Sequence, residues 1–444
     1  MRDANDRRYL KEAENPSLSI DEEVTDSVRD ILDRVRNDGD EALFELTARF
    51  DGVEREALAV SEGEIEAARG ELAADEREAI DATVENVREF HEEQRAHVEG
   101  FEREFRPGIT LGQRVVPVET AGVYVPGGRH PLVATPAMTI VPAVVAGVDR
   151  IVACAPPQGD GTITPAQLYA MDRAGADEIY CVGGAQAIGA MAYGTESVPA
   201  VNLVTGPGNV FTTEAKRQVY GQVGIDFLAG PTEVLIVADD SVDPGLVATD
   251  LLAQAEHDPN SRPVLVVTAG HAGGEDGTTG DATPESVASA VIDELEAQLP
   301  DLRTEETARE CWDANGEVIV VSDREAAVAV ANEYAMEHLQ LMVADPEDLV
   351  PDLRNYGSLF IGPHSPVVFG DKAVGTNHCL PTLGVARYSG GIWVGTYLKT
   401  LTHQRLTAEG AASLAPHAAK ICELEGTHAH QRSAEARLVD PENR

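Results

Sequence analysis

The sequence predicts an α/β protein with two incomplete Rossmann-like domains, each built on a parallel β-sheet. Short β-rich runs alternate with helical stretches through the middle of the chain, as βαβ units require. Many of these runs end in glycine or aspartate, residues that are typical of the turn that follows a strand. The chain has 444 residues, enough for two or three domains with cores of their own. We therefore expect a helical N-terminal region, two α/β domains and a helical C-terminal tail.

Residues 1–100 are predicted to be helical. Ser19 and Glu22 have the spacing of a capping box, and Ser61 and Glu64 repeat it. Apolar residues follow at helical intervals in a first and a third amphipathic segment. These residues are Val24, Val28, Ile31, Leu32 and Val35 in the first segment, and Ala79, Val84, Val87 and Phe90 in the third.

The strand-like runs begin near Val115 and fall into two series. The first comprises residues 122–125, 150–154, 178–182 and 201–204, and the second residues 234–237, 264–267, 318–321 and 358–361. Residues 271–284 are rich in Gly, Asp and Thr and are predicted to form a surface loop. After Pro381 the strand signal stops, and helices are expected to the end. The predicted units are residues 1–123 with 239–380, residues 124–238, and residues 381–444.

The composition is strongly acidic. Lys and Arg number 34 against 76 Asp and Glu, for a net charge of −42, and hydrophobic residues make up an ordinary 43%. The acidic residues are spread along helical segments, so a folded protein with an acidic surface is favoured over a disordered chain. Such a surface repels nucleic acids and anionic membranes, and we expect neither as a partner. It is also typical of proteins adapted to high salt, where screening weakens self-repulsion.

The cysteines and the N-terminus predict a cytoplasmic protein. The five cysteines are scattered without a Cys-x-x-Cys spacing, which favours reduced thiols over a disulfide framework. Residues 1–10 are charged and lack the apolar core of a signal peptide, and no long apolar run follows. Cys379 lies beside His378, so a nucleophilic thiol has to be considered. A small buried hydrophobe is the more ordinary interpretation of this cysteine.

Several short segments carry groups suited to metal binding and acid–base chemistry. Gln254 and His257 lie three residues apart in an apolar segment, which places them on one face of a helix. Their amide oxygen and imidazole are ligands that zinc accepts. Further polar motifs follow downstream at Glu337-His338, Gly370-Asp371, Gly375-Thr376-Asn377-His378 and Glu425-Gly426-Thr427-His428-Ala429-His430. Each alone has an ordinary structural interpretation, such as a helix cap or a buried histidine, and their joint occurrence favours a site.

Glycine-rich turns follow several predicted strands, at residues 126–128, 183–186 and 206–209. In an open α/β sheet, ligands bind at the carboxyl ends of strands, where glycine lets backbone N–H groups approach a phosphate. None of these turns has the Gly-x-Gly-x-x-Gly pattern of dinucleotide-binding proteins. Tight turns from strand to helix explain them equally well.

The order of the motifs resembles the histidinol dehydrogenase family over nearly the whole chain. The motifs are Gly-Val-Tyr-Val-Pro-Gly-Gly, Gly-Gly-Ala-Gln-Ala-Ile, Gly-Pro-Gly-Asn, Ala-Gly-Pro-Thr-Glu-Val-Leu, Gln-Ala-Glu-His, Glu-His-Leu, Gly-Thr-Asn-His-Cys-Leu-Pro-Thr and Glu-Gly-Thr-His-Ala-His. The resemblance implies an enzyme that uses zinc and NAD to oxidise a primary alcohol to a carboxylate in two hydride transfers.

The resemblance also implies roles for individual residues. His338 would take the hydroxyl proton as hydride leaves for NAD, and Glu337 would then activate water to attack the aldehyde. Zinc would be held by Gln254, His257, Asp371 and His430, a set of two nitrogens and two oxygens that suits this metal. Substrate contacts are expected from Thr232, Gln254, His257, His338, Asp371, His378, Glu425 and His430, and nucleotide contacts from Tyr124, Gln186 and Asn209. In this family the subunits form an intertwined dimer, so the resemblance implies a homodimer in which Glu425 and His430 complete the neighbour's site.

Several residues differ from those that are usual in this family, and these differences indicate a different substrate. Thr232 stands where histidinol-oxidising members usually have serine, and Met336 where they usually have proline. Residues 127–134 and 386–400 also differ from the usual pattern, and resemble a side branch that includes sulfopropanediol 3-dehydrogenase. The metal and acid–base set is kept while these segments change, as expected when a reaction is retained and its substrate differs. The preferred interpretation is oxidation of 2,3-dihydroxypropane-1-sulfonate to sulfolactate.

Several alternatives stay open at this point. Oxidation of L-histidinol to L-histidine is the main one. Arg129, His130 and Arg387 are candidate contacts for a substrate anion, although ordinary surface positions explain them better. A zinc-dependent hydrolase uses similar groups, and NAD binding would separate the two classes. The residues do not choose between NAD and NADP.

Overall fold

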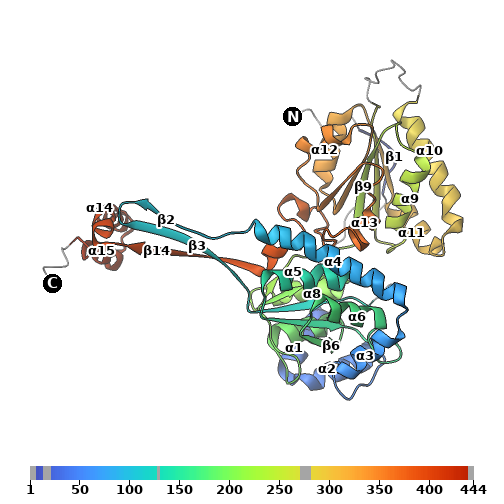
Figure 1. Cartoon of the computed structure of the whole chain (residues 1–444). Helices are drawn as coiled ribbons and strands as arrows, with labels where there is room; N and C mark the ends of the chain where they lie inside the picture. Colours follow the sequence, from blue (N-terminus) through green and yellow to red (C-terminus); the bar gives the residue numbers. More distant parts are fainter. Residues whose placement is uncertain (1–6, 14–21, 128–130, 271–281, 439–444) are drawn as a thin grey trace.

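The computed structural model describes residues 7–13, 22–127, 131–270 and 282–438. Two α/β lobes lie one above the other, and a long arm projects from their junction (Figure 1). Arg129, His130, Ser19 and residues 271–281 of the predicted loop lie outside the described residues. The fold confirms the predicted class of mixed α/β protein with parallel sheets, an N-terminal helical region and C-terminal helices.

The lower lobe is built on a five-stranded sheet in the order β6-β5-β4-β7-β8, with every neighbouring pair parallel. Its strands are β4 (Thr120–Tyr124), β5 (Arg150–Ala155), β6 (Glu178–Cys181), β7 (Leu203–Thr205) and β8 (Gly224–Ile225). Its helices are α1 (Glu22–Asp38), α2 (Asp40–Phe50), α3 (Glu62–Glu71), α4 (Ala74–Ala96), α5 (Thr135–Ala146), α6 (Pro165–Ala174), α7 (Gly184–Tyr193) and α8 (Val210–Val219). Both faces of the sheet are covered, which explains why its strands are almost continuously apolar.

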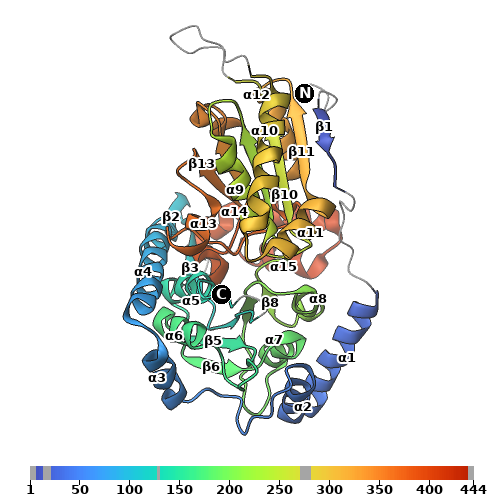
Figure 2. The same ribbon diagram turned by 90° about the vertical axis from the view of Figure 1, so that its right-hand side faces the viewer.

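The upper lobe is built on a six-stranded sheet in the order β1-β11-β10-β9-β12-β13, parallel except for the antiparallel edge strand β1. Its strands are β1 (Arg7–Lys11), β9 (Glu233–Ala238), β10 (Arg262–Val267), β11 (Glu317–Val321), β12 (His338–Met342) and β13 (Ser358–Ile361). Its helices are α9 (Pro244–Ala255), α10 (Pro284–Gln298), α11 (Glu305–Asn315), α12 (Arg324–Tyr334) and α13 (Val367–Lys372). Figure 2 shows α9, α10 and α11 gathered on one side of this sheet.

The arm is a three-stranded antiparallel ribbon in the order β14-β3-β2 that carries two helices at its tip (Figure 1). It comprises β2 (Phe101–Arg106), β3 (Ile109–Pro117), β14 (Leu398–Leu406), α14 (Ala408–Glu425) and α15 (His428–Glu435). The prediction of helix alone after Pro381 is therefore wrong at β14. Polar and charged residues alternate irregularly in this strand, and only its first residue, Leu398, packs against a core, so it lacks the apolar pattern that identifies a buried strand.

The N-terminal helices pack on the lower lobe. Residues of α1 and α2 share a core with one face of the five-stranded sheet, and residues of α3 and α4 with the other. This differs from the predicted grouping of residues 1–123 with 239–380, because the amphipathic helices cover the open sheet faces nearest to them. The capping box of Ser61 and Glu64 is confirmed.

The buried face of α4 differs in detail from the prediction. Ile80, Val84, Val87 and His91 are buried, whereas Ala79 and Phe90 are exposed. Spacings of four, three and four residues keep the buried set on one stripe, and the two exposed residues flank it.

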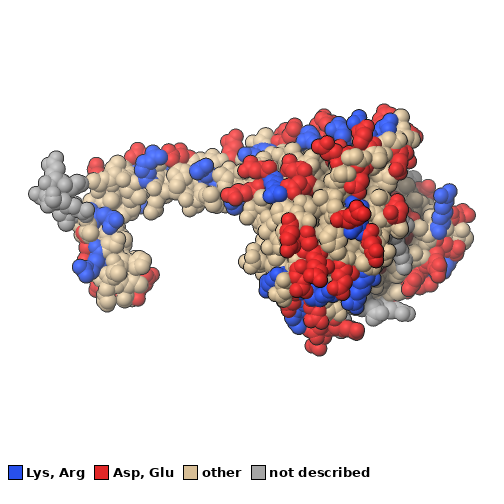
Figure 3. All heavy atoms as spheres, turned by 90° about the horizontal axis from the view of Figure 1, so that it is seen from below, with Lys and Arg blue, Asp and Glu red and all other residues tan. Residues whose placement is uncertain are grey.

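The acidic surface leads to a prediction about salt. Figure 3 shows acidic side chains spread over the face seen from below, with basic ones scattered among them. At a net charge of −42 the folded chain repels itself, and salt reduces this repulsion as the screening length falls from about 30 Å at 0.01 M to about 3 Å at 1 M. We expect the protein to lose activity and helical structure in dilute buffer. Circular dichroism and activity across a KCl series test this, and full activity without added salt would contradict it.

Among the residues that the structure describes, no helix combines the length and the apolar character needed to cross a bilayer.

Candidate active site at the junction of the two lobes

The predicted acid–base pair lies where β12 begins. Helix α12 ends at Tyr334, and the left-handed conformation of the next residue, Ala335 (φ 53°), turns the chain toward the sheet. Glu337 and His338 follow at once and are almost completely buried. Strand β9 is the neighbour of β12, so its first residue, Glu233, lies beside the pair. The amino-terminal ends of two adjacent strands therefore hold this site, and not the carboxyl ends where ligands of open α/β sheets usually bind.

Hydrogen bonds fix the position of both side chains. The Glu337 carboxylate accepts from Thr232 Oγ1 at 2.5 Å and from the backbone N–H of Glu233 at 3.0 Å. His338 Nδ1 lies 3.1 Å from the carbonyl oxygen of Glu233, which can only accept, so Nδ1 carries a proton. The opposite ring nitrogen, Nε2, is buried without a hydrogen-bond partner among the described residues. It lies 3.5 Å from Asp371 Oδ1 and is the nitrogen available to a ligand.

The charges of this group shift one another's pKa values. Burial raises the pKa of Glu337, although His338 opposes this. Burial disfavours the imidazolium of His338, but the carboxylates of Glu337 and Asp371 outweigh burial and raise the pKa of His338 to about 9. Burial also disfavours ionised Asp371, yet its interaction with the nearby His338 ring lowers its pKa well below the usual value. Two carboxylates thus share one histidine, and Asp371 is the more firmly ionised of the two.

Three of the four predicted zinc ligands converge on the same place. Gln254 lies in the last turn of α9, and its amide nitrogen donates to Thr232 Oγ1 at 2.8 Å, which leaves its amide oxygen as the atom that could bind zinc. His257 follows the helix, and burial lowers its pKa and keeps its ring neutral. Asp371 lies on α13 and acts electrostatically on both His257 and His338. An amide oxygen, a neutral imidazole and an ionised carboxylate fit zinc.

The donor set of a single chain is nevertheless incomplete. No group of three His, Cys, Asp or Glu side chains able to hold a metal is present within residues 7–13, 22–127, 131–270 and 282–438. The remaining predicted ligand, His430, and the predicted substrate contact Glu425 belong to α15 and to the end of α14, at the tip of the arm. Figure 1 shows these helices far from both lobes. Both side chains are exposed to solvent.

His378 links the site to the lower lobe. Its Nδ1 lies 2.8 Å from the backbone oxygen of Asp371, and its Nε2 lies 3.1 Å from Thr135 Oγ1, at the first residue of α5. Asn377 donates to the carbonyl oxygen of Met138 in the same helix at 2.6 Å. Since α5 follows β4, these contacts bring the amino-terminal edge of the upper sheet against the carboxyl edge of the lower sheet.

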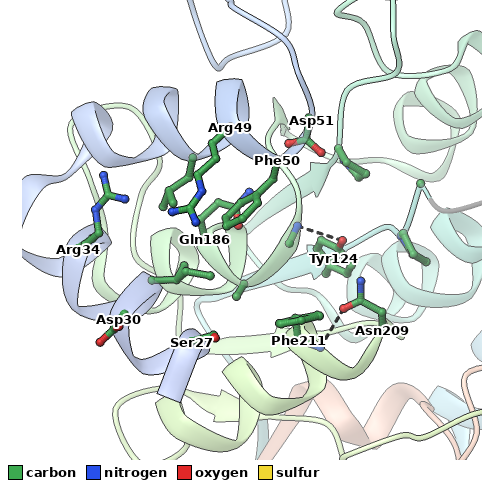
Figure 4. Close-up of a pocket in the computed structure, with 17 residues that line it drawn as sticks. Ser27, Asp30, Arg34, Arg49, Phe50, Asp51, Tyr124, Gln186, Asn209 and Phe211 are labelled. Atoms are coloured by element: carbon green, nitrogen blue, oxygen red, sulfur yellow. Dashed lines mark hydrogen bonds between the residues drawn. The ribbon is translucent and has the colours of Figure 1, made fainter. Parts of the chain in front are cut away.

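The predicted nucleotide contacts line one cavity at that carboxyl edge. Tyr124, Gln186 and Asn209 all border a cavity of about 670 Å³ between α1, α2 and the turns that lead into α7 and α8 (Figure 4). From β4 the chain passes to β5 and β6 on one side of the sheet and then crosses to β7 and β8 on the other side, so the cavity lies at a topological switch point. The lining includes the exposed rings of Phe50 and Phe211.

Backbone turns shape the floor of this cavity. The N–H of Gly184, the first residue of α7, donates to the hydroxyl of Tyr124 at 3.2 Å. Burial raises the pKa of Tyr124 to about 12, which keeps the hydroxyl neutral. The Asn209 side chain caps α8 by accepting from the N–H groups of Phe211 and Thr212. Two helix N-termini therefore point toward the cavity, where they favour an anion such as a phosphate.

Arg387 and Cys379 contribute little to the site. Arg387 is exposed, and its guanidinium donates to the carbonyl oxygens of Gly384 and Glu333. Cys379 is buried, and burial raises the pKa of its thiol well above the usual value, which suppresses its nucleophilic thiolate. This supports the ordinary interpretation of that cysteine as part of the core.

Sequence reasoning missed two residues of the site. Glu233 accepts at Oε1 from the N–H groups of Glu337 and Leu383, and burial and the nearby Glu337 raise its pKa to about 7. The sequence feature that could have identified Glu233 is a charged residue at the start of an otherwise apolar strand. Lys372 lies 3.6 Å from the Asp371 carboxylate, and its signal was a lysine next to a predicted metal ligand in a chain with only five lysines.

Comparisons with known proteins point to one family. The sequence model described as "Histidinol dehydrogenase" matches residues 14–438. A "Histidinol dehydrogenase homolog" of Shouchella clausii is 42% identical over 97% of this chain and 98% of its own length. The sulfopropanediol 3-dehydrogenase of Ruegeria pomeroyi is also 42% identical, over 97% and 96%. The crystal structure of histidinol dehydrogenase from Elizabethkingia anophelis superimposes with a TM-score of 0.87 at 33% identity, covering 95% of this chain and 94% of that one.

Proposed function

This chain belongs to the histidinol dehydrogenase family, and we propose that it uses zinc and NAD to oxidise a primary alcohol through an aldehyde to a carboxylate. The observation that carries the proposal is the buried pair Glu337 and His338, which two neighbouring strands hold at the junction of the lobes. The pair faces predicted metal ligands on one side, and the cavity with Tyr124, Gln186 and Asn209 lies in the adjoining lobe.

His338 acts as the base of the first oxidation. Its Nδ1 proton is committed to the carbonyl oxygen of Glu233, so Nε2 accepts the hydroxyl proton of the alcohol while hydride leaves the same carbon. The buried carboxylates of Glu337 and Asp371 stabilise the imidazolium that results. When bound, zinc would orient the alcohol oxygen, favour the loss of its proton and take up the charge of Asp371, which otherwise holds a proton on His338.

Glu337 acts in the second half of the reaction. Its carboxylate is held by Thr232 and by the N–H of Glu233, and burial raises its pKa toward the range of a useful base. It takes a proton from the water that adds to the aldehyde, and the hydrate then gives its hydride to a second NAD. The overall change consumes one alcohol, one water and two NAD⁺, and releases one carboxylate, two NADH and three protons.

The cavity in the lower lobe supports NAD binding. The helix N-termini of α7 and α8 suit the pyrophosphate, and the exposed rings of Phe50 and Phe211 offer surfaces on which a base can stack. NAD binding also distinguishes a dehydrogenase from a zinc-dependent hydrolase, since the site residues alone are compatible with both classes of enzyme.

The arm supports a homodimer with shared sites. It leaves apolar side chains exposed along the ribbon and at the tip, which a second copy of the chain would bury. These side chains are Phe101, Phe105, Leu401, Ile421, Leu424 and Leu438. In such a dimer, Glu425 and His430 of one chain complete the site of the other, and His430 supplies the ligand that the single chain lacks. All five cysteines are unpaired, which is in keeping with a cytoplasmic enzyme.

For the substrate we propose 2,3-dihydroxypropane-1-sulfonate, which would yield sulfolactate. The altered segments around Thr232 and Met336 and the similarity to the Ruegeria pomeroyi enzyme support it. L-histidinol is the second candidate, because relatives of equal similarity carry the name histidinol dehydrogenase.

A parallel assay tests this function. The protein is loaded with zinc in high salt and given NAD with the sulfonate alcohol or with histidinol, and NADH is followed by absorbance. We expect two NADH per sulfonate alcohol and none from histidinol. The reverse result would assign the enzyme to histidinol, and no NADH from either would overturn both substrates.

A further inference from the structure

Lys372 places a positive charge at the rim of the candidate active site. It is the last residue of α13 and directly follows Asp371. Its Nζ lies 3.6 Å from Asp371 Oδ2, and its side chain is 44% exposed against 14% for Asp371. The other oxygen of that carboxylate lies 3.5 Å from His338 Nε2. A single carboxylate therefore separates the proposed base from an ammonium group that is open to solvent.

Contacts across the junction of the lobes hold this residue in place. Thr83 Oγ1, on α4 of the lower lobe, donates to the carbonyl oxygen of Lys372 at 2.8 Å. Asn86 Nδ2, one turn further along that helix, donates to the carbonyl oxygen of Ala373 at 2.7 Å. The charge of Lys372 also acts on His257 and His378, and works with burial to lower the pKa values of both. Its ammonium thus lies within electrostatic reach of several groups of the site.

The remaining charges near the reacting atoms are mostly negative. Glu233 and Glu337 are buried carboxylates linked by hydrogen bonds, and the Asp371 carboxylate, 14% exposed, lies 3.5 Å from His338 Nε2. Arg262, the cation that acts on Glu233, is paired with Glu317, and Arg387 is bound to backbone carbonyls on the surface. Lys372 is therefore positioned to offset this negative charge on the solvent-exposed side of the group. A flexible lysine with a compact ammonium suits a tetrahedral anion such as a sulfonate.

We propose that Lys372 binds the anionic group of the substrate and selects an anionic alcohol over a cationic amino alcohol. The proposal rests on the proposed function. In a three-carbon hydroxysulfonate the sulfur lies only about 4 Å from the reacting carbon, so the sulfonate can reach Lys372 while the hydroxyl faces His338. Histidinol carries an ammonium at neutral pH, which Lys372 repels. The same residue thus favours one candidate substrate and disfavours the other.

The test compares Lys372→Met and Lys372→Arg with wild type and with Lys11→Met. Lys11 lies on the outer edge strand β1, where it donates to the carbonyl oxygen of Asp313, and serves as the matched control. Each protein is assayed at one fixed salt concentration with the sulfonate alcohol, with uncharged propane-1,2-diol and with histidinol. Propane-1-sulfonate, which has no hydroxyl group, is tested as a competitive inhibitor, and zinc content is measured for every variant.

For Lys372→Met we expect a loss of about 10- to 100-fold in kcat/KM for the sulfonate alcohol, mainly through KM, as the loss of a charge-assisted contact implies. The inhibition constant of propane-1-sulfonate should rise by a similar factor. Turnover of the uncharged diol should hold within about twofold, kcat/KM for histidinol should rise, and Lys372→Arg should recover part of the loss.

Three results would overturn the inference. An unchanged kcat/KM for the sulfonate alcohol in Lys372→Met would do so while leaving the proposed function standing. An equal loss for all three alcohols together with lost zinc would show that Lys372 supports Asp371 instead of binding substrate. Wild-type enzyme that oxidises histidinol and ignores the sulfonate alcohol would overturn the substrate itself, and that failure is visible before any variant is made.

Discussion

Replacing His338 with asparagine should lower kcat by about 10²- to 10⁴-fold, the usual contribution of a general base. Asparagine can still donate a hydrogen bond to the carbonyl oxygen of Glu233, so the local structure is retained, but it offers no basic nitrogen at the position of Nε2. Because His338 is not a predicted zinc ligand, zinc content and NAD affinity should stay unchanged. Steady-state NADH formation, metal analysis and NAD titration measure the three quantities.

The matched control is His364→Asn, which alters an exposed histidine just beyond β13. It should retain wild-type kcat. A near-normal rate in His338→Asn would remove this residue from the mechanism.

Glu337→Gln separates the two halves of the reaction, because the variant should still form the aldehyde but should lose the oxidation that follows. The yield of this variant should fall from two NADH per alcohol toward one, and the aldehyde should accumulate in solution.

Mixing two inactive chains should restore activity if the arm completes a neighbouring site. His338→Asn and His430→Ala are each expected to be nearly inactive, the first for want of a base and the second for want of a metal ligand. In a mixed dimer with exchanged arms, one site combines both defects and the other has neither. Random pairing makes half the dimers mixed, so co-expression should give about a quarter of wild-type activity.

The comparison needs two purification tags, so that only mixed dimers are assayed after tandem purification. These dimers should have about half the wild-type activity. If His430 served its own chain instead, each chain of the mixed dimer would carry one defect in its own site and no activity would return. Wild-type chains carrying the same two tags provide the control. A fully active monomer would contradict the shared site directly.

The buried strands were the most predictable part of the fold. All eight predicted strand runs correspond to strands of the two sheets, within one or two residues at most ends. These strands are covered on both faces, so burial demands nearly continuous apolar residues, and such runs are visible in the sequence. Strand β12 was not predicted because His338 and Gln340 interrupt its apolar pattern. Both are nevertheless buried, and each makes one hydrogen bond, His338 Nδ1 to the carbonyl oxygen of Glu233 and Gln340 Nε2 to the Asp250 carboxylate.

The arm strands and the edge strand β1 were missed for the opposite reason. Strand β2 is exposed along its whole length, and β14 nearly so, so burial places no constraint on their side chains. Their pairing is fixed by backbone hydrogen bonds to β3, which depend on where the chain returns in space and not on local composition. β1 likewise joins the sheet from the far end of the sequence by pairing with β11.

The sequence by itself determined the α/β class, the family and the residues able to act as ligands, acids and bases. These properties follow from side-chain chemistry and local spacing, which the chain carries whatever its final shape. The tertiary structure alone decided which groups meet: it placed Thr232 between Gln254 and Glu337, freed Nε2 of His338, brought Lys372 to the rim, and kept His430 at the tip of the arm. These placements depend on contacts between residues about 20 to 290 positions apart, and no local sequence pattern records them.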